Sequence, residues 1–346
     1  MSVRYCRTGN PKKIGRKFTS LIFEMEMIDK NTSSFNYPAQ FGIFTGLIGG
    51  GLIIGTLISA GLWVMFTGNS VLTMGVDMLK PEYYYETMTL QAVSTLFYFF
   101  LPAFIFAAIC YRKPAKFLGF NSSINMKQVL ILIGILLLTF PLSGALAELN
   151  KIVPISAKLA AKFRSMEDTQ TKAEAALINI NSFPRYIFSM IIVGILPGLF
   201  EETVFRGGLQ NIFTRWFKGP VIAIIITAAL FSLVHASYYG FLVRFALGII
   251  LGLIFYLSGN LWLSVLFHFL YNGFQVTVLY ATHQSIAAGK NQKDIESNFP
   301  IWAGVLALIA IIYLLIKFKE ISSLQKEKAR VSDPDEIDFD FNNWQS

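Results

Sequence analysis

The chain has 346 residues, of which 54% are hydrophobic and only 14% are charged. An ordinary soluble domain is charged at roughly 25% of its positions, so this composition excludes a soluble globular protein and predicts an all-α, polytopic bundle of membrane helices. The net charge of +8 does not indicate nucleic-acid binding, because the basic residues cluster at the ends of apolar runs, where they anchor membrane helices. We therefore expect membrane lipid, and no nucleic acid, as a partner. The two cysteines, Cys6 and Cys110, offer neither a disulfide framework nor a metal-ligand spacing.

Eight apolar stretches reach or approach the roughly 20 residues that an α-helix needs to cross the hydrocarbon core. They lie at residues 42–66, 89–110, 129–147, 186–214, 220–238, 242–258, 261–281 and 301–318. The first contains glycines at four-residue spacing, which let helix backbones approach closely in lipid. We interpret this spacing as a packing signal.

The apolar stretches divide the chain into five parts. These are a basic N-terminal segment (1–41), three membrane helices with an amphipathic loop (42–184), a candidate catalytic core (185–281), a final loop with the last membrane helix (282–320) and an acidic disordered tail (321–346). The N-terminal segment does not resemble a signal peptide, since acidic residues interrupt any apolar core, and Met25 or Met27 is an alternative start. Residues 155–177 are predicted to form an amphipathic helix that lies at the interface or caps the bundle.

The basic residues of the short loops predict the orientation in the membrane. The 111–128 loop holds four basic residues, whereas the 67–88 loop holds only Lys80. With eight spans both termini lie on one side of the membrane. The excess of basic residues in the 111–128 loop places that side in the cytoplasm. The 148–185 loop, also rich in basic residues, argues against this orientation. We favour a bacterial inner membrane, and the sequence does not indicate an oligomeric state.

Ionisable side chains are concentrated in one part of this apolar chain. Between Tyr186 and Ala281 the only acidic residues are Glu201 and Glu202. Two of the three histidines of the chain lie in the same region. Such residues cost at least a few kcal/mol each at membrane depth and usually face a cavity or a partner. Each alone is more often a packing contact than a catalyst, but their coincidence on nearby helices predicts a functional site.

Helical geometry separates the two glutamates. Residues four apart share a helix face, whereas adjacent residues point about 100° apart. Glu202 is therefore predicted to pair with Arg206, while Glu201 points to the side of Phe205 without that partner. At 1.5 Å per residue, Glu201 and His235 come out at matching depth, about 22 and 24 Å from the turn that joins their helices.

The remaining polar residues complete a possible hydrolytic site. His268 and Asn272 share one helix face, as Phe231 and His235 share another. The depth of His268 matches that of Glu201 only if its helix is tilted, or if its end is not level with the ends of the neighbouring helices. In a dry cavity, a glutamate could take a proton from water, imidazole could orient that water or protonate a leaving amine, and an amide could donate to an oxyanion. The residue types are therefore compatible with peptide hydrolysis without a covalent nucleophile.

Three short segments resemble the motifs of a known family. "EETVFR" (201–206), "FSLVH" (231–235) and "HFLYN" (268–272) match the patterns EExxxR, FxxxH and HxxxN. These mark the CPBP family of intramembrane proteases, also called Abi, which includes CAAX prenyl proteases and bacteriocin-processing members. The resemblance covers about residues 185–281 and has no departure at the motif positions, and the count of eight spans suits the CAAX protease branch.

The resemblance implies an α-helical bundle with an active site inside the membrane. The residues that it assigns to catalysis are Glu201, His235, His268 and Asn272. The residues that it assigns to support of the site are Glu202, Arg206 and Phe231. By this analogy Glu201 activates the water, both histidines assist, and Asn272 stabilises the oxyanion.

The family was once described as metalloproteases, and Glu201, His235 and His268 could together hold Zn²⁺. The sequence has no HExxH helix, and a glutamate-activated water needs no metal, so we favour a site without a cofactor. The leading hypothesis is an intramembrane endopeptidase that cuts a membrane-associated peptide or protein, in CAAX-type or bacteriocin- or signal-type processing. A non-catalytic immunity or scaffold protein remains open, as does a proton-coupled transporter, although we find no inverted repeat of the kind many transporters contain. The sequence names no substrate.

Overall fold

The computed structural model describes residues 35–120, 123–152, 154–177, 180–287 and 300–332. Within these ranges the chain forms helices and no strands, and seven helices or continuous helix runs are long and apolar enough to cross a membrane. The predicted polytopic helical bundle is therefore confirmed, and the protein is an integral, multi-pass membrane protein. The expectations for residues 1–34 and 333–346 lie outside the described residues.

Five of the seven candidate spans are single helices. They are α2 (Tyr37–Thr67), α7 (Met126–Ile152), α13 (Phe241–Ser258), α14 (Leu261–Ala287) and α15 (Ile301–Ser332). α15 continues past the expected boundary at residue 320, so residues 321–332 are helical and do not belong to a disordered tail. Most residues of this extension, in the stretch "ISSLQKEKAR", are strong helix formers.

The other two spans are runs of α-helix interrupted by π-helical turns. The first comprises η1 (Pro81–Tyr83), α4 (Tyr84–Thr95), η2 (Leu96–Phe100) and α5 (Leu101–Cys110). The second comprises α9 (Phe183–Ser189), η3 (Met190–Ile195), α10 (Leu196–Glu202), η4 (Thr203–Gln210) and α11 (Asn211–Trp216). Of these turns η2, η3 and η4 are π-helical, a form that often occurs near functional sites.

The fifth predicted span, 220–238, is shorter than expected. Its helix, α12 (Pro220–Val234), has 15 residues, whereas a full crossing requires about 20. After the helix the chain turns at residues 235–240. Ala236 has a positive φ of 51° there, which an α-helix cannot accommodate. The predicted eight spans thus become seven full-length spans and one short apolar helix.

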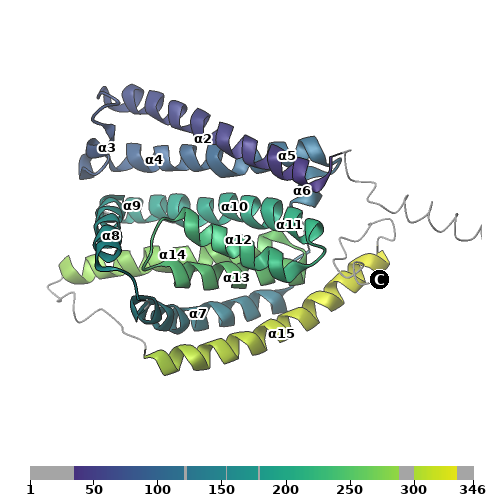
Figure 1. The fold of residues 1–346 in the computed structure, drawn as a ribbon. Coiled ribbons are helices and arrows are strands. Elements are labelled where there is room, and N and C mark those ends of the chain that lie inside the picture. The colour runs from purple at the N-terminus through teal and green to yellow at the C-terminus, as the bar shows by residue number, and fades with distance from the viewer. Residues whose placement is uncertain (1–34, 121–122, 153, 178–179, 288–299, 333–346) are drawn as a thin grey trace, which may run out of the picture.

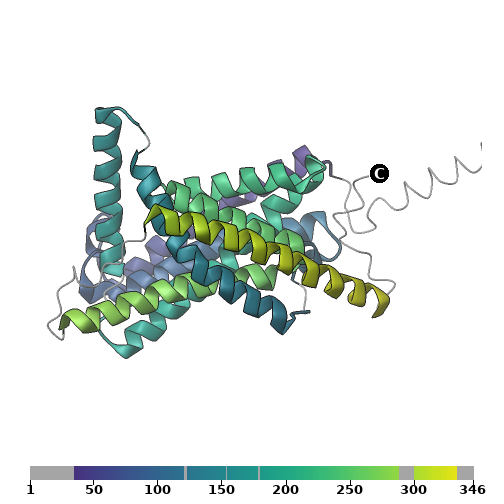
Figure 2. The same cartoon turned by 90° about the horizontal axis from the view of Figure 1, so that it is seen from below.

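The bundle has three layers in Figure 1. α2 packs against α4 and α5 on one side, α9–α11 lie with α12, α13 and α14 in the middle, and α7 packs along α15 on the other side. Two short helices, α3 (Met74–Asp77) and α6 (Pro114–Phe117), lie at opposite ends of the first layer. Figure 2 shows α15 crossing the outer face of α7. The site segment is therefore enclosed between the outer layers.

The amphipathic helix predicted at 155–177 is present as α8 (Ala157–Leu177). It stands across one end of the bundle in both views (Figures 1 and 2). The ring of Phe163 stacks on that of Tyr238 with centroids 4.6 Å apart, and Ser237 donates a hydrogen bond to Glu167 at 2.7 Å. α8 therefore caps the turn that follows α12.

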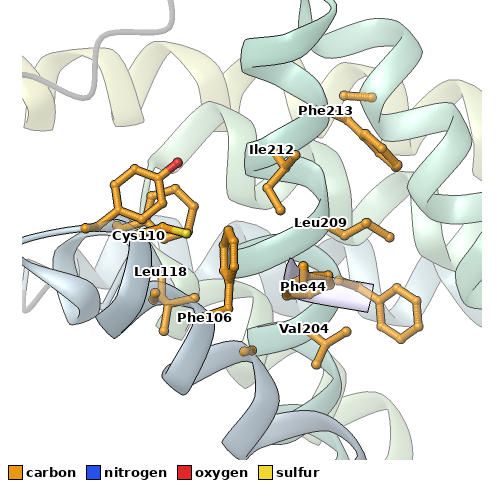
Figure 3. Packing of buried hydrophobic residues seen from close by; sticks show 14 of the residues in the cluster. Phe44, Phe106, Cys110, Leu118, Val204, Leu209, Ile212 and Phe213 are labelled. Carbon is orange, nitrogen blue, oxygen red and sulfur yellow. The ribbon is translucent and has the colours of Figure 1, made fainter. Parts of the chain in front are cut away.

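Two consecutive glycines bring η4 close to the first layer. A Cβ at Gly208 would lie 2.5 Å from the ring of Phe44 on α2, and one at Gly207 would lie 2.8 Å from the backbone oxygen of Leu118. Figure 3 shows the resulting cluster, in which side chains of α2 and α5 pack against those of η4 and α11. This packing fixes the helix run that carries the candidate site.

Candidate active site

The predicted ion pair at the start of η4 is present. Arg206 Nη1 donates to Glu202 Oε1 at 2.6 Å, and neither side chain is exposed to solvent. Arg206 Nη2 also donates to the backbone oxygen of Gly248 on α13, at 3.2 Å. A buried charge pair survives only when its members are well paired and hydrogen-bonded. Arg206 therefore links Glu202 to α13.

His268, on α14, connects the two glutamates. Its Nδ1 lies 2.8 Å from Glu202 Oε1, and because a carboxylate only accepts, the ring donates this bond. Its Nε2 lies 3.9 Å from Glu201 Oε2. One edge of the imidazole is thus fixed by Glu202, and the other faces Glu201. The bond from His268 to Glu202 was not predicted from the sequence.

Glu201 has fewer contacts than its neighbour. Its side chain is 15% exposed, and its buried Oε2 has no hydrogen-bond partner among the described residues. The approach of α10 to α14 depends on Gly198, where a Cβ would lie 3.2 Å from the backbone oxygen of Val265 and the backbone nitrogen of Phe269. This close packing brings Glu201 next to His268.

His235 lies where α12 ends and the chain turns. Its ring donates through Nδ1 to the backbone oxygen of Phe231 at 2.7 Å, which leaves Nε2 for other partners. Glu201 and His268 lie close enough to interact electrostatically with its ring. The matching depth predicted for Glu201 and His235 agrees with the observed helix ends, since α11 ends at Trp216 and α12 begins at Pro220.

Phe231 packs beside the site, as predicted. Its ring centroid lies 4.7 Å from Cζ of Arg206 and 5.9 Å from the ring of His268. The ring of Phe205 lies 5.2 Å from the ring of Phe231, measured between centroids. These rings exclude water from the ion pair and hold the imidazole in place.

Asn272 differs from the other predicted residues. Its Nδ2 donates to the backbone oxygen of Val193 in η3, at 3.3 Å. Among the described residues no hydrogen bond joins it to Glu201 or to either histidine. The structure thus connects six of the seven predicted residues through direct contacts or nearby charges, and fixes Asn272 against a neighbouring π-helical turn.

The alternative zinc site is not formed by the side chains described. Across these ranges, no three His, Cys, Asp or Glu side chains are grouped so that they could hold a metal ion.

One charged residue near the site was not predicted from the sequence. Arg244 lies on α13, and its charge is within interaction range of His235. In the sequence it stands near the start of an apolar stretch, where a basic residue usually indicates an interfacial anchor. Only the turn at 235–240 places it beside the histidine.

Comparison with known proteins gives matches to this same region. Residues 183–274 match a family model described as type II CAAX prenyl endopeptidase Rce1-like. An uncharacterized 24.3 kDa protein of Escherichia coli is 35% identical over 91 residues, which are 25% of this chain and 42% of that protein. The chain thus spans less than half the length of this curated relative, and no solved structure matches significantly. Residues 183–274 of the chain are thus similar to the Rce1-like type II CAAX prenyl endopeptidase family.

Proposed function

We propose that the protein is an intramembrane endopeptidase that hydrolyses a peptide bond of a membrane-associated peptide or protein. The observation that carries the proposal is the position of His268, which binds Glu202 through Nδ1 and faces the unpartnered Glu201 through Nε2. Two adjacent carboxylates with different partners can serve different chemical roles. The similarity of residues 183–274 to the Rce1-like endopeptidase family supports proteolysis as that chemistry.

We infer that a water molecule bridges Glu201 and His268. Their facing atoms lie 3.9 Å apart, too far for a direct hydrogen bond. A water at about 2.8 Å from each atom would bridge them. Glu201 would then take a proton from this water as its oxygen attacks the substrate carbonyl.

The later steps need a proton donor and an anion stabiliser. Collapse of the tetrahedral intermediate breaks the C–N bond, and the leaving amine receives the proton held by Glu201, directly or through Nε2 of His235. One N–H of Asn272 is used by Val193, and its second N–H could donate to the oxyanion. This mechanism needs no metal, and CAAX-type or signal-type processing is our proposed substrate class.

The test compares matched carboxylate variants of the purified protein. Glu201→Gln should abolish cleavage of a prenylated CAAX reporter and of membrane peptides, because a carboxamide cannot accept the proton. Glu148→Gln, in an exposed pair with Lys151, is the control and should cut like the wild type. Equal activity of Glu201→Gln and wild type would contradict the mechanism. A wild-type protein that binds these peptides without cutting them would favour a scaffold role.

A chelator separates the metal-free mechanism from the alternative. Activity should persist after treatment with EDTA, since none of the proposed steps uses a metal. Loss of activity with recovery on addition of Zn²⁺ would show that activity depends on zinc and would contradict the metal-free mechanism.

A further inference from the structure

Arg244 has a buried nitrogen with no partner. Its side chain is partly exposed, but Nη1 is shielded from solvent and has no hydrogen-bond partner in the described part of the chain. Nor does Arg244 form an ion pair with any residue in these ranges. A guanidinium offers five N–H donors and no acceptor, and a buried donor left unsatisfied is costly. Arg244 Nη1 is therefore available to donate to a hydrogen-bond acceptor from outside the chain.

The surroundings place this donor at the edge of the candidate active site. Nη1 lies against the turn that follows α12, so close that a Cβ at Gly240 would collide with it. The charge of Arg244 is within interaction range of His235 on this turn and of Tyr271 on α14. A ligand bound to Arg244 would therefore lie near His235, one of the residues proposed to cut the peptide.

The acidic residues nearby do not neutralise Arg244. Glu167 accepts a hydrogen bond from Ser237 instead, and Glu201 Oε2 faces His268 Nε2 at 3.9 Å. The acids of this site thus have other roles, which leaves one cation available for an anionic ligand.

We propose that Arg244 binds the free α-carboxylate of the peptide substrate. The inference rests on the proposed function. A guanidinium matches the planar fork of a carboxylate and can donate to both oxygens. Every peptide has one such group at its C-terminus, whatever its sequence. Anchoring it near His235 restricts cleavage to bonds near the end of the chain, so Arg244 sets where the protease cuts.

The experiment uses two peptides that differ only at the C-terminus, as a free acid and as a carboxamide. A charge-assisted hydrogen bond is worth enough that the wild type should cut the acid about 10- to 100-fold more efficiently, measured as kcat/KM. Arg244→Gln should lower kcat/KM for the acid to that for the amide and leave the amide almost unchanged. Arg112→Gln, an exposed arginine between α5 and α6 at the opposite end of the bundle (Figure 1), is the matched control.

Two results would overturn the proposal while leaving the protease function intact. One is equal cleavage of acid and amide by the wild type, which requires no variant to fold. The other is an equal loss on both peptides in Arg244→Gln, which would make the residue structural. A third result would assign Arg244 to a lipid phosphate instead. In that case anionic phospholipid vesicles would inhibit the wild type but not Arg244→Gln, and the wild type would cut the acid and the amide equally well.

A binding measurement separates this proposal from the proposed function. Fluorescence anisotropy with the Glu201→Gln variant should show tighter binding of the labelled acid than of the amide, and the difference should vanish when Arg244→Gln is added. If the wild type cuts neither peptide, proteolysis fails, but this difference still supports the carboxylate site. Equal binding of the two peptides contradicts it.

Discussion

Glu201 and Glu202 are consecutive in the chain, yet their side chains meet different surroundings. Glu202 accepts from Arg206 and His268, while Glu201 Oε2 has no partner among the described residues. The pairing with Arg206 follows from four-residue spacing and was predicted correctly, even though the segment is π-helical beyond Glu202. The bond from His268 could not be predicted, because spacing within one helix does not determine which other helix packs against it.

Removing Arg206 should destabilise the protein far more than changing Glu201. Arg206→Met leaves Glu202 buried without its guanidinium, and breaking such a pair costs about 3–5 kcal/mol. Glu201→Gln removes no recorded hydrogen bond, so its unfolding temperature in detergent should stay near that of the wild type. Thermal unfolding of both variants, followed by a thiol-reactive dye, compares them. Similar unfolding temperatures for Arg206→Met and wild type would show that the pair contributes little.

His268 should separate stability from activity. In His268→Asn the shorter side chain keeps a donor near the Nδ1 position but has no atom at Nε2. We therefore expect a near-normal unfolding temperature with activity lowered about 10²–10⁴-fold, the usual contribution of a proton-transfer group. His268→Leu, which also removes the donor to Glu202, should lower both. Full activity in the asparagine variant would remove His268 Nε2 from the mechanism.

At the scale of helices, apolar length predicted most spans but not their internal form. Seven of the eight predicted spans correspond to full-length candidates, since about 20 apolar residues are needed for any crossing. The early end of α12 depends on the turn at 235–240, and the π-helical turns depend on packing between helices. Neither leaves a clear signal in the hydrophobic pattern. The depth of His268 was also unresolved, because depth counts assume parallel helices with matched ends.

Gly198 should be the glycine on which the geometry of the site depends. A Cβ there would meet backbone atoms of α14 at 3.2 Å, so α10 must move away by a few tenths of an ångström. Gly198→Ala should therefore shift Glu201 from His268 and lower kcat, with a smaller effect on unfolding temperature. Gly46→Ala, on α2 where nothing lies within 4 Å, is the control and should retain activity. Normal kcat in Gly198→Ala would show that the separation between Glu201 and His268 tolerates this movement.

At the scale of the whole molecule, the first and last described helices have their outer ends on the same side of the bundle. α2 begins, and α15 ends, at the side of the bundle where α6 and α11 lie (Figure 1). α8 and the turn at 235–240 lie towards the opposite side. The short α12 reverses the direction of the chain as a full span would, so the start of α2 and the end of α15 lie on the same side. Which side faces the cytoplasm is a separate question, decided by the basic residues.

Cysteine labelling in intact cells tests the predicted orientation. Lys218 lies in the exposed turn between α11 and α12, and Lys151 lies near the end of α7 at the opposite side. Cysteine replaces each in turn in a Cys6→Ser background, and Cys110 can stay because it is fully buried. Since basic residues of short loops are retained in the cytoplasm, Lys218→Cys should react with a membrane-impermeant maleimide only after permeabilisation. Lys151→Cys should react in intact cells, and its loss of an exposed ion pair with Glu148 should cost little stability. The reverse pattern would mean that the basic 148–185 loop sets the orientation and that the α8 side faces the cytoplasm.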